Sequence, residues 1–338
     1  MLLCELVEGA DPKIEISGIF TDSRKIRTNG IFVCLKGTKV DGHNHIAEAE
    51  KKGAALIVAS HPVVSSVPVL YTDRPAETLS GLSERFYQYP AKKLRLIGVT
   101  GTNGKTTVTY LIKAILEAAG KTCGLIGTNE ILIGKKRSDF KSMMPTTPDA
   151  LELAQIFSEM VSAGMEYAVM EVSSHALTLD RVAGVRFKVG TFTNLTEDHL
   201  DFHRDMEDYC DAKGLLFRMC EIGCVNADDP WTARLVKDAT CRILRYSAKG
   251  GAELRAKNIA LFPSCVEFDA VAGAEQARIR LGIPGAFSVY NALGVIQSAQ
   301  ALGIPLAQIA ASLETAKGVK GRAEVVPTPG KDYTVLID

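Results

Sequence analysis

The stretch 98-GVTGTNGKTTV-108 decides how the rest of the chain is interpreted. It overlaps the end of 94-LRLIGVT-100, an apolar run typical of a buried parallel strand, and it leads into 108-VTYLIKAILEAAG-120, which has helical spacing and ends at a glycine. A glycine-rich turn between a strand and a helix lets backbone N–H groups converge on phosphate oxygens, and the helix N-terminus adds partial positive charge. The order of strand, turn, lysine, hydroxyl and helix therefore predicts a nucleotide loop in which Lys105 neutralises phosphate charge and Thr106 can ligate Mg²⁺.

The loop departs from the strict GxxxxGK[ST] pattern, because Val99 stands where the first glycine should be. The plain alternative is a glycine-rich strand-to-helix turn that binds no ligand.

Strand-like and helical segments alternate after this loop, which predicts an α/β fold with a doubly wound, mostly parallel central sheet. Short alternating runs over 242–280 favour a small antiparallel appendage, and two helices are expected over 288–304 and 305–316. The strand-like runs are 122-TCGLIG-127, 167-YAVMEVSS-174, 189-VGTFTNL-195 and 222-IGCVNAD-228.

The segment before the loop has the pattern of a small α/β domain of its own. Four short strand-like runs surround a helical stretch at 46–52. The stretch 78–93 is expected to begin with a helix that ends at Pro90 and to continue as a polar linker. We therefore expect a domain over 1–90, a nucleotide-binding domain over 91–330, and the start of a further domain at 331–338.

Composition argues for an ordinary globular protein. Of the 338 residues, 46% are hydrophobic and 23% charged, and 39 basic side chains balance 39 acidic ones, so no nucleic-acid or membrane partner is expected. The 8 cysteines include no CxxC pair, which favours reduced thiols. With no signal-like N-terminus and only short apolar runs, a cytoplasmic location is predicted.

Three polar positions follow predicted strands or lie on a predicted helix. Glu171 ends a strand, at the edge where an open α/β sheet holds its ligands, and is placed to bind Mg²⁺. The run 192-FTNLTEDHLDFH-203 gathers polar side chains after the next strand, and Lys213 lies on a helix. Taken alone, a glutamate in the position of Glu171 is more often a solvated or capping residue, such a run is explained by a polar turn with helix caps, and a lysine such as Lys213 is usually a solvated surface cation.

The sequence motif 100-TGTNGKT-106 resembles the nucleotide loop of the Mur ligases and of their relatives, folylpolyglutamate synthetase and cyanophycin synthetase. Further stretches resemble Mur ligases of the MurE type, in order along the whole chain: 20-FTDSRKI-26, 32-FVCLKGTKVDGHNH-45, 144-MPTTPDALEL-153, 170-MEVSSHALTLDRV-182, 192-FTNLTEDHLDFH-203, 208-DYCDAKGLLF-217, 288-SVYNALGVIQSA-299 and 318-GVKGRAEVV-326.

The resemblance implies a set of site residues. It implies catalytic roles for Lys105, Glu171, His199 and Lys213, with Thr106, Glu171, His199 and Lys213 at the metal site and a CO₂-derived carbamate on Lys213. It implies that ATP is bound by Gly101, Thr102, Asn103, Gly104, Lys105, Thr106, Thr107, Asn291 (at adenine), Arg322 and Asp338 (at ribose). It implies that the UDP-linked precursor is bound by Thr21, Ser23, Thr38, Lys39, Val40, Thr146, Thr147, Ser173 and Arg181.

Some positions depart from the family pattern or have plain explanations. Leu179 stands where some MurE enzymes have glutamine, and Pro145 where some have asparagine. Pro148 is expected at the first position of the next helix. Asn291, early in a predicted helix, is equally a capping residue.

The reaction implied is amide-bond formation in peptidoglycan synthesis. ATP phosphorylates the terminal carboxylate of UDP-MurNAc-L-Ala-D-Glu, and the amine of diaminopimelate or lysine attacks the acyl phosphate. A monomer is expected, and a third domain that selects the amino acid is expected after Asp338. Two alternatives stay open: a non-catalytic fragment that binds nucleotide and UDP-precursor, and a folylpolyglutamate-type ligase, against which the TDSR-type N-terminal segment argues.

Overall fold

Two sheets organise the chain in the computed structural model, which describes residues 1–37, 40–140, 142, 144–316, 318–326 and 335–337. The residues form two compact units. The first unit comprises Met1–Lys92, Pro148–Ser158 and Leu179–Val185, and the second comprises Lys93–Thr147, Glu159–Thr178 and Arg186–Asp338. The domain bounds expected from the sequence stay a prediction.

The first unit is built on a parallel sheet of four strands in the order β1-β2-β3-β4. Buried aliphatic side chains of β1 to β3 pack against the helices α1 and α3, which gives this unit a core of its own. Its elements are α1 (Leu3–Leu6), β1 (Gly18–Phe20), η1 (Ser23–Lys25), β2 (Gly30–Val33), η2 (Gly42–His45), α2 (Ile46–Lys51), β3 (Ala54–Ala59), β4 (Val69–Tyr71) and α3 (Pro75–Phe86).

The helix expected to end at Pro90 ends four residues earlier, at Phe86. Gln88 and Tyr89 both have left-handed backbone, with φ of 58° and 55°, and this conformation stops the helical hydrogen-bonding pattern before the proline is reached. A 3₁₀ turn, η3 (Pro90–Lys93), follows.

The second unit is built on an eleven-stranded sheet in the order β15-β14-β13-β12-β11-β10-β5-β9-β6-β7-β8. Its centre, from β12 to β6, is parallel, and both edges are antiparallel, so the predicted α/β class is confirmed. The strands are β5 (Arg95–Thr100), β6 (Cys123–Ile126), β7 (Ile131–Ile133), β8 (Lys136–Arg137), β9 (Tyr167–Glu171), β10 (Phe187–Phe192), β11 (Cys220–Asn226), β12 (Arg242–Ser247), β13 (Leu254–Leu261), β14 (Val266–Ala272) and β15 (Glu275–Leu281), with a separate pair, β16 (Glu324–Val326) and β17 (Val335–Ile337).

The segment 242–280 differs from expectation in one respect. Strands β13, β14 and β15 are antiparallel as predicted, but β12 pairs in parallel with both β11 and β13. The antiparallel strands β13 to β15 therefore form the predicted small antiparallel appendage, as a continuation of the central sheet at its edge.

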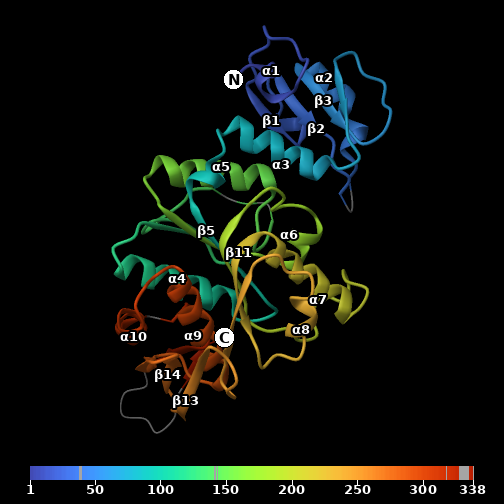
Figure 1. Cartoon of the computed structure of the whole chain (residues 1–338). Coiled ribbons are helices and arrows are strands. Elements are labelled where there is room, and N and C mark those ends of the chain that lie inside the picture. The colour runs from blue at the N-terminus through green and yellow to red at the C-terminus, as the bar shows by residue number, and fades with distance from the viewer. Residues whose placement is uncertain (38–39, 141, 143, 317, 327–334, 338) are drawn as a thin grey trace. The chain divides into compact units, whose positions relative to one another are not determined.

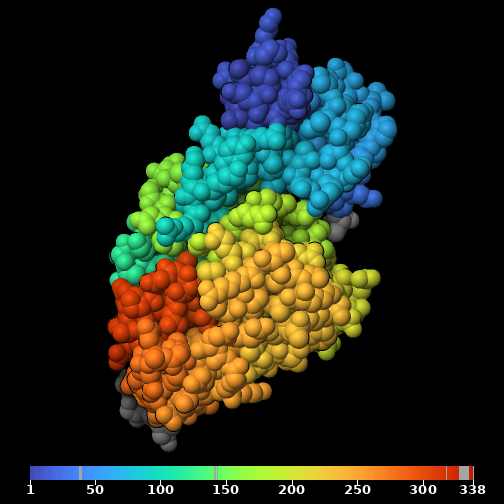
Figure 2. All heavy atoms as spheres, in the orientation of Figure 1, coloured from blue at the N-terminus to red at the C-terminus, as the bar shows by residue number. Residues whose placement is uncertain are grey.

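Helices cover both faces of the central sheet (Figure 1). On one face α4, α9 and α10 share a buried apolar core with the strands, and the surfaces of α9, α10 and β12 to β15 adjoin in the space-filling view (Figure 2). The helices of this unit are α4 (Lys105–Ala118), α6 (Ser174–Thr178), α7 (Met206–Gly214), η4 (Leu215–Arg218), α8 (Thr232–Leu235), α9 (Ala286–Ala301) and α10 (Leu306–Thr315). No helix in the described ranges is both long and apolar enough to cross a membrane.

A row of glycines on the opposite face brings α7 close to the sheet. Gly98, Gly190 and Gly223 lie side by side on β5, β10 and β11. A Cβ at these positions would come within 3.1 Å, 3.2 Å and 2.6 Å of the side chains of Leu216 or Phe217 in η4. The missing side chains let η4 lie directly on the sheet, and this places the end of α7, which precedes η4, beside the glycine-rich turn after β5.

A second local expectation needs correction. Pro148 precedes the helix α5 (Ala150–Ser162) by two residues and is not its first residue. Asp149 and Glu152 form a capping box there, in which Asp149 accepts a hydrogen bond from the Glu152 N–H at 2.8 Å and Glu152 accepts one from the Asp149 N–H at 3.3 Å. The cap, rather than the proline, starts this helix.

Candidate functional site

The turn between β5 and α4 adopts a conformation that requires glycine at two positions. Gly101 has φ of +144° and Gly104, the residue before the helix, has φ of +85°. A Cβ on Gly101 would lie 1.9 Å from Thr193 Oγ1, and one on Gly104 would lie 2.5 Å from Asn291 Oδ1. The backbone of the turn is therefore held against two other elements, with the first turn of α4 directly behind it.

The side chain of Lys105 folds back over this turn. Its Nζ donates to the backbone oxygens of Gly101 and Thr102, each at 2.9 Å, and burial lowers its pKa below the usual lysine range. A cation held here at the positive end of a helix is suited to a phosphate group.

A buried carboxylate stands next to the same turn. Glu171, at the end of β9, is 1% exposed, and its Oε1 accepts a hydrogen bond from Thr106 Oγ1 at 3.0 Å. Two positions 65 residues apart in the sequence are thereby in direct contact. Both line a cavity of about 230 Å³ together with the glycine-rich turn.

Lys213 approaches the turn from the face of the central sheet that lies opposite to α4, α9 and α10. Its side chain is 1% exposed, its Nζ donates to Gly101 O at 3.0 Å, and it lies 4.4 Å from the centroid of the Tyr209 ring. Burial, and secondarily the charge of Lys105, lower the pKa of Lys213 well below that of an ordinary lysine. The alternative of a solvated surface cation is wrong for this residue.

His199 lines the same small cavity as Glu171. It has left-handed backbone, with φ of +54°, and its Nε2 lies 3.7 Å from Asp198 Oδ2. Asp198 also lines the cavity. In the described part of the chain no three side chains of His, Cys, Asp or Glu could hold a metal ion together. Of the four predicted metal ligands only Glu171 and His199 belong to these residue types. The other two ligands would be the hydroxyl of Thr106 and a modified Lys213.

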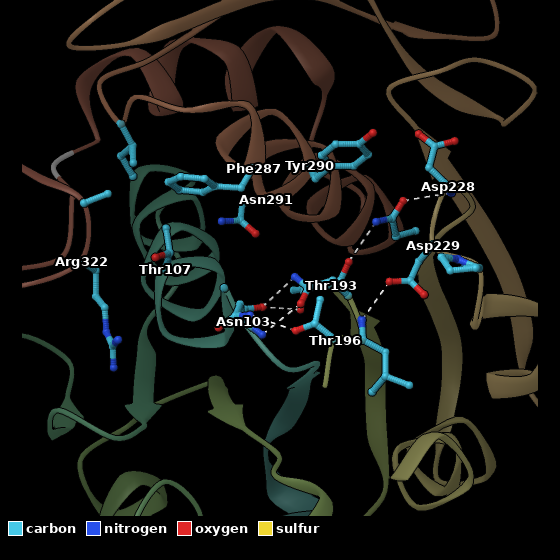
Figure 3. A pocket seen from close by; sticks show the side chains of 17 residues that line it. Asn103, Thr107, Thr193, Thr196, Asp228, Asp229, Phe287, Tyr290, Asn291 and Arg322 are labelled. Atoms are coloured by element: carbon cyan, nitrogen blue, oxygen red, sulfur yellow. Dashed lines mark hydrogen bonds between the residues drawn. The ribbon is translucent and has the colours of Figure 1, made fainter. Parts of the chain in front are cut away.

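A larger cavity of about 750 Å³ adjoins the small one, and Asn103, Gly104, Thr107 and Arg322 line both. Phe287, Tyr290 and Asn291 of α9 face into it (Figure 3). Asn291 lies well inside α9 and is 5% exposed, so the capping alternative is wrong. Among the residues the structure describes, its amide has no hydrogen-bond partner, which leaves the amide available to a ligand.

Several residues of this cavity were not predicted. Asn226 ends β11, Asp228 and Asp229 follow it, and all three line the cavity. The strand-like run before them was a usable signal, because the carboxyl ends of parallel strands meet at one edge. For Phe287 and Tyr290 the sequence held no such signal, since aromatic residues on a helix are more often core.

The residues expected to bind the precursor occur in both units. In the second unit Thr146 lines the small cavity, while Thr147 Oγ1 donates to Glu171 O at 3.0 Å and accepts from the Ser173 N–H at 3.1 Å.

The other precursor residues lie in the first unit. Ser23 Oγ donates to Glu48 Oε2 at 2.7 Å, Val40 is 59% exposed and Thr21 is half-buried. Burial lowers the pKa of Arg181, with the nearby carboxylate of Asp149 opposing that shift. Thr38, Lys39 and Asp338 lie outside the described residues.

All eight cysteines are free in the structure.

Comparisons with known proteins agree with these features. Residues 99–299 match the model of the Mur ligase middle domain, and residues 15–87 match that of the Mur ligase family catalytic domain. A curated relative from Bacillus licheniformis, named UDP-N-acetylmuramoyl-L-alanyl-D-glutamate--2,6-diaminopimelate ligase, is 41% identical over 333 residues, which cover 96% of this chain and 67% of the relative.

Solved structures show the same fold. A structure of a UDP-N-acetylmuramoyl-L-alanyl-D-glutamate--2,6-diaminopimelate ligase superposes with a TM-score of 0.85 at 24% identity, covering 97% of this chain and 69% of that one. Folylpolyglutamate synthase from Mycobacterium tuberculosis, complexed with ADP and AMPPCP, reaches 0.63 at 18% identity, covering 79% and 67%. The resemblance inferred from the motifs is confirmed, and the chain belongs to the Mur ligase family.

Proposed function

We propose that this chain carries the nucleotide- and acceptor-binding machinery of an ATP-dependent ligase that adds diaminopimelate to UDP-MurNAc-L-Ala-D-Glu in peptidoglycan synthesis. The names of relatives about 40% identical over two thirds of their length support the substrates. The observation that carries the proposal is the contact between Thr106 and the buried Glu171 at 3.0 Å, because it joins a phosphate-binding turn to a carboxylate in one cavity.

The proposed roles in the small cavity follow from charge and donor chemistry. When nucleotide binds, the ammonium group of Lys105 exchanges its two backbone acceptors for phosphate oxygens. There it stabilises the negative charge that develops on the phosphate oxygens during phosphoryl transfer. Glu171 and Thr106 offer carboxylate and hydroxyl oxygens, the donor type that Mg²⁺ prefers, and His199 adds an imidazole nitrogen at the same cavity. Bound Mg²⁺ supplies charge neutralisation for the phosphates.

Lys213 is proposed to bear the carbamate. A neutral buried amine is the form that attacks CO₂, and the lowered pKa of Lys213 favours that form. The new anion adds an oxygen donor near the glycine-rich turn. Native mass spectrometry with and without bicarbonate tests this, since a mass gain of one CO₂ is expected in the natural chain and not in Lys213→Met.

The larger cavity is proposed to take the nucleoside end of ATP, with Asn291 at the base and Arg322 on the phosphate side. Thr146, Thr147 and Ser173 are proposed for the peptide end of the acceptor. Thr21, Ser23, Thr38, Lys39, Val40 and Arg181 remain proposals for the UDP-sugar and its peptide, and Asp338 for the ribose.

The reaction transfers the γ-phosphoryl group of ATP to the D-glutamyl carboxylate, giving ADP and an acyl phosphate. The amine of diaminopimelate then attacks the carbonyl carbon, inorganic phosphate leaves, and the amine loses a proton. The chain contributes mainly by positioning the groups and by electrostatics. A cytoplasmic location and a monomeric state remain predictions.

The experiment is a measurement of ADP release from ATP and Mg²⁺ with UDP-MurNAc-L-Ala-D-Glu and either diaminopimelate or lysine. We expect product with diaminopimelate and none when a folate and glutamate replace the two substrates. ATP binding without ADP release under any condition would contradict the proposal and favour the non-catalytic fragment. Turnover with the folate and glutamate, and none with the UDP-linked acceptor, would favour the folylpolyglutamate-type ligase. The folylpolyglutamate synthase structure has the lower TM-score of the two solved structures compared above.

A further inference from the structure

Thr128, in the loop after β6, holds the carboxylate of Glu171 at two points. Its backbone N–H donates to Glu171 Oε1 at 2.9 Å, and its hydroxyl donates to Glu171 Oε2 at 3.1 Å. The same hydroxyl lies 3.0 Å from Thr146 Oγ1. Thr128 also lines the small cavity with both of these residues.

Counting donors fixes the direction of these bonds. A hydroxyl has one proton and two lone pairs, so a Thr128 that donates to Glu171 must accept from Thr146. The carboxylate has about four lone-pair positions. Oε1 accepts from Thr128 N and Thr106 Oγ1, while among the described residues Oε2 accepts from Thr128 Oγ1 alone. The remaining position is therefore on Oε2, beside the Thr128 hydroxyl.

The backbone around Thr128 is shaped for this approach. A Cβ on Gly127 would come 2.5 Å from Glu171 Oε1, so the loop reaches the carboxylate only because residue 127 has no side chain. At the other end Thr146, a β-branched residue, has left-handed backbone with φ of +65°. Such strain at a non-glycine residue persists only where the surroundings enforce it.

These contacts form one continuous path. It runs from Thr146, in the loop proposed to bind the acceptor, through Thr128 and Glu171 to Thr106 in the first turn of α4. Each end of the path lies at a different proposed substrate, and Thr128 provides the link between the acceptor loop and the carboxylate.

We propose that Thr128 is a positioning residue that orients Glu171 for a divalent cation and couples the acceptor loop at Thr146 to cation and nucleotide binding. This inference rests on the proposed function, because it takes Glu171 as a metal ligand. A purely structural Thr128 would stabilise the loop and leave cation affinity unchanged.

The test measures Mn²⁺ binding to the full chain in the presence of ADP by electron paramagnetic resonance, and so requires no turnover. Thr128→Val removes the hydroxyl and keeps the shape, and Thr128→Ser restores the hydroxyl. We expect Thr128→Val to weaken Mn²⁺ binding about tenfold or more, in the range of lost outer-shell contacts to metal ligands, and Thr128→Ser to stay within about twofold of the natural chain. Metal-free ADP binding should be equal in all three.

Thr122→Val is the matched control. Thr122 precedes β6 at its other end, and its hydroxyl donates to Gly164 O at 2.9 Å, far along the strand from the cavity. This variant should bind Mn²⁺ like the natural chain. Gly127→Ala provides a second route, since its Cβ displaces Glu171 while the Thr128 hydroxyl is kept, and it should also weaken Mn²⁺ binding.

The coupling is read by adding UDP-MurNAc-L-Ala-D-Glu. In the natural chain the acceptor should shift the Mn²⁺ affinity, and in Thr128→Val the two should become independent. Equal Mn²⁺ affinity in the natural chain and Thr128→Val overturns the inference and leaves the proposed function intact. A natural chain that binds no Mn²⁺ with ADP overturns the proposed function itself.

Discussion

The two adjoining cavities of the second unit differ in how their walls are held before a ligand arrives. In the small one Glu171 accepts three side-chain or backbone hydrogen bonds, and Lys105 and Lys213 both donate to Gly101 O. In the large one the Asn291 amide has no partner among the described residues, and Phe287 is 54% exposed. The small cavity is preorganised for charge, whereas the large one offers surface area and, within the described part of the chain, the unpartnered amide of Asn291.

The acidic residues of the large cavity strengthen this contrast. Asp228 accepts hydrogen bonds from the backbone N–H groups of Ala248 and Lys249, and Asp229 accepts from those of Leu195 and Trp231. Their carboxylates therefore serve the fold. Substitutions in the small cavity should change the rate of the reaction, and substitutions in the large one should change nucleotide affinity.

The largest effect is expected for Lys105→Met. Removing a cation directed at transferred phosphate should lower kcat by about a thousandfold or more, as for other preorganised charge-stabilising groups. ADP release under saturating substrates measures this. Lys113→Met, on the same helix, removes a lysine that pairs with Glu117 at 2.6 Å and should retain most of the turnover. A kcat close to natural in Lys105→Met would remove the distinction between the cavities.

A smaller effect is expected for Asn291→Leu. The change keeps the volume but removes the amide that faces the large cavity, so ADP should bind about tenfold more weakly, which is the loss of roughly one good hydrogen bond. The value of kcat at saturating ATP should change little. Isothermal titration measures the affinity, with Gln308→Leu on the exposed side of α10 as the control. An unchanged ADP affinity together with a large fall in kcat would reverse the assignment of the two cavities.

The same contrast explains what could be predicted from the sequence. The glycine-rich turn, the strand ending at Glu171 and the helix bearing Lys213 follow from local patterns, because strand period, helix period and turn residues are local properties. Thr128 could not be predicted, since a threonine in a loop has no special spacing and its partner is 43 residues away. Asn291 invited a capping explanation because its helix begins earlier, at Ala286, than the pattern suggested.

The smallest effect is expected on the pH dependence of the free energy of unfolding, and it arises from the buried Lys213 beside the small cavity. In the unfolded chain Lys213 titrates near its ordinary pKa of 10.5, while in the folded chain burial lowers the pKa well below that value. Between the two pKa values the unfolded state binds the proton and the folded state does not, so the free energy of unfolding rises with pH, by at most about 1.4 kcal/mol per pH unit for one group. Below the folded pKa the group contributes no such slope.

Lys213→Met lacks this linkage and keeps the buried volume. In CO₂-free buffer the gain in the free energy of unfolding of Lys213→Met over the natural chain should therefore be largest at low pH. This difference in stability between the two chains should narrow as pH rises toward about 10. Urea unfolding at a series of pH values measures the difference. Lys188→Met, in the exposed pair with Glu221, controls for the loss of a lysine and should show no such narrowing. A pH-independent difference for Lys213→Met would mean that Lys213 is charged in the folded chain, and the small cavity would then lack the neutral amine that CO₂ requires.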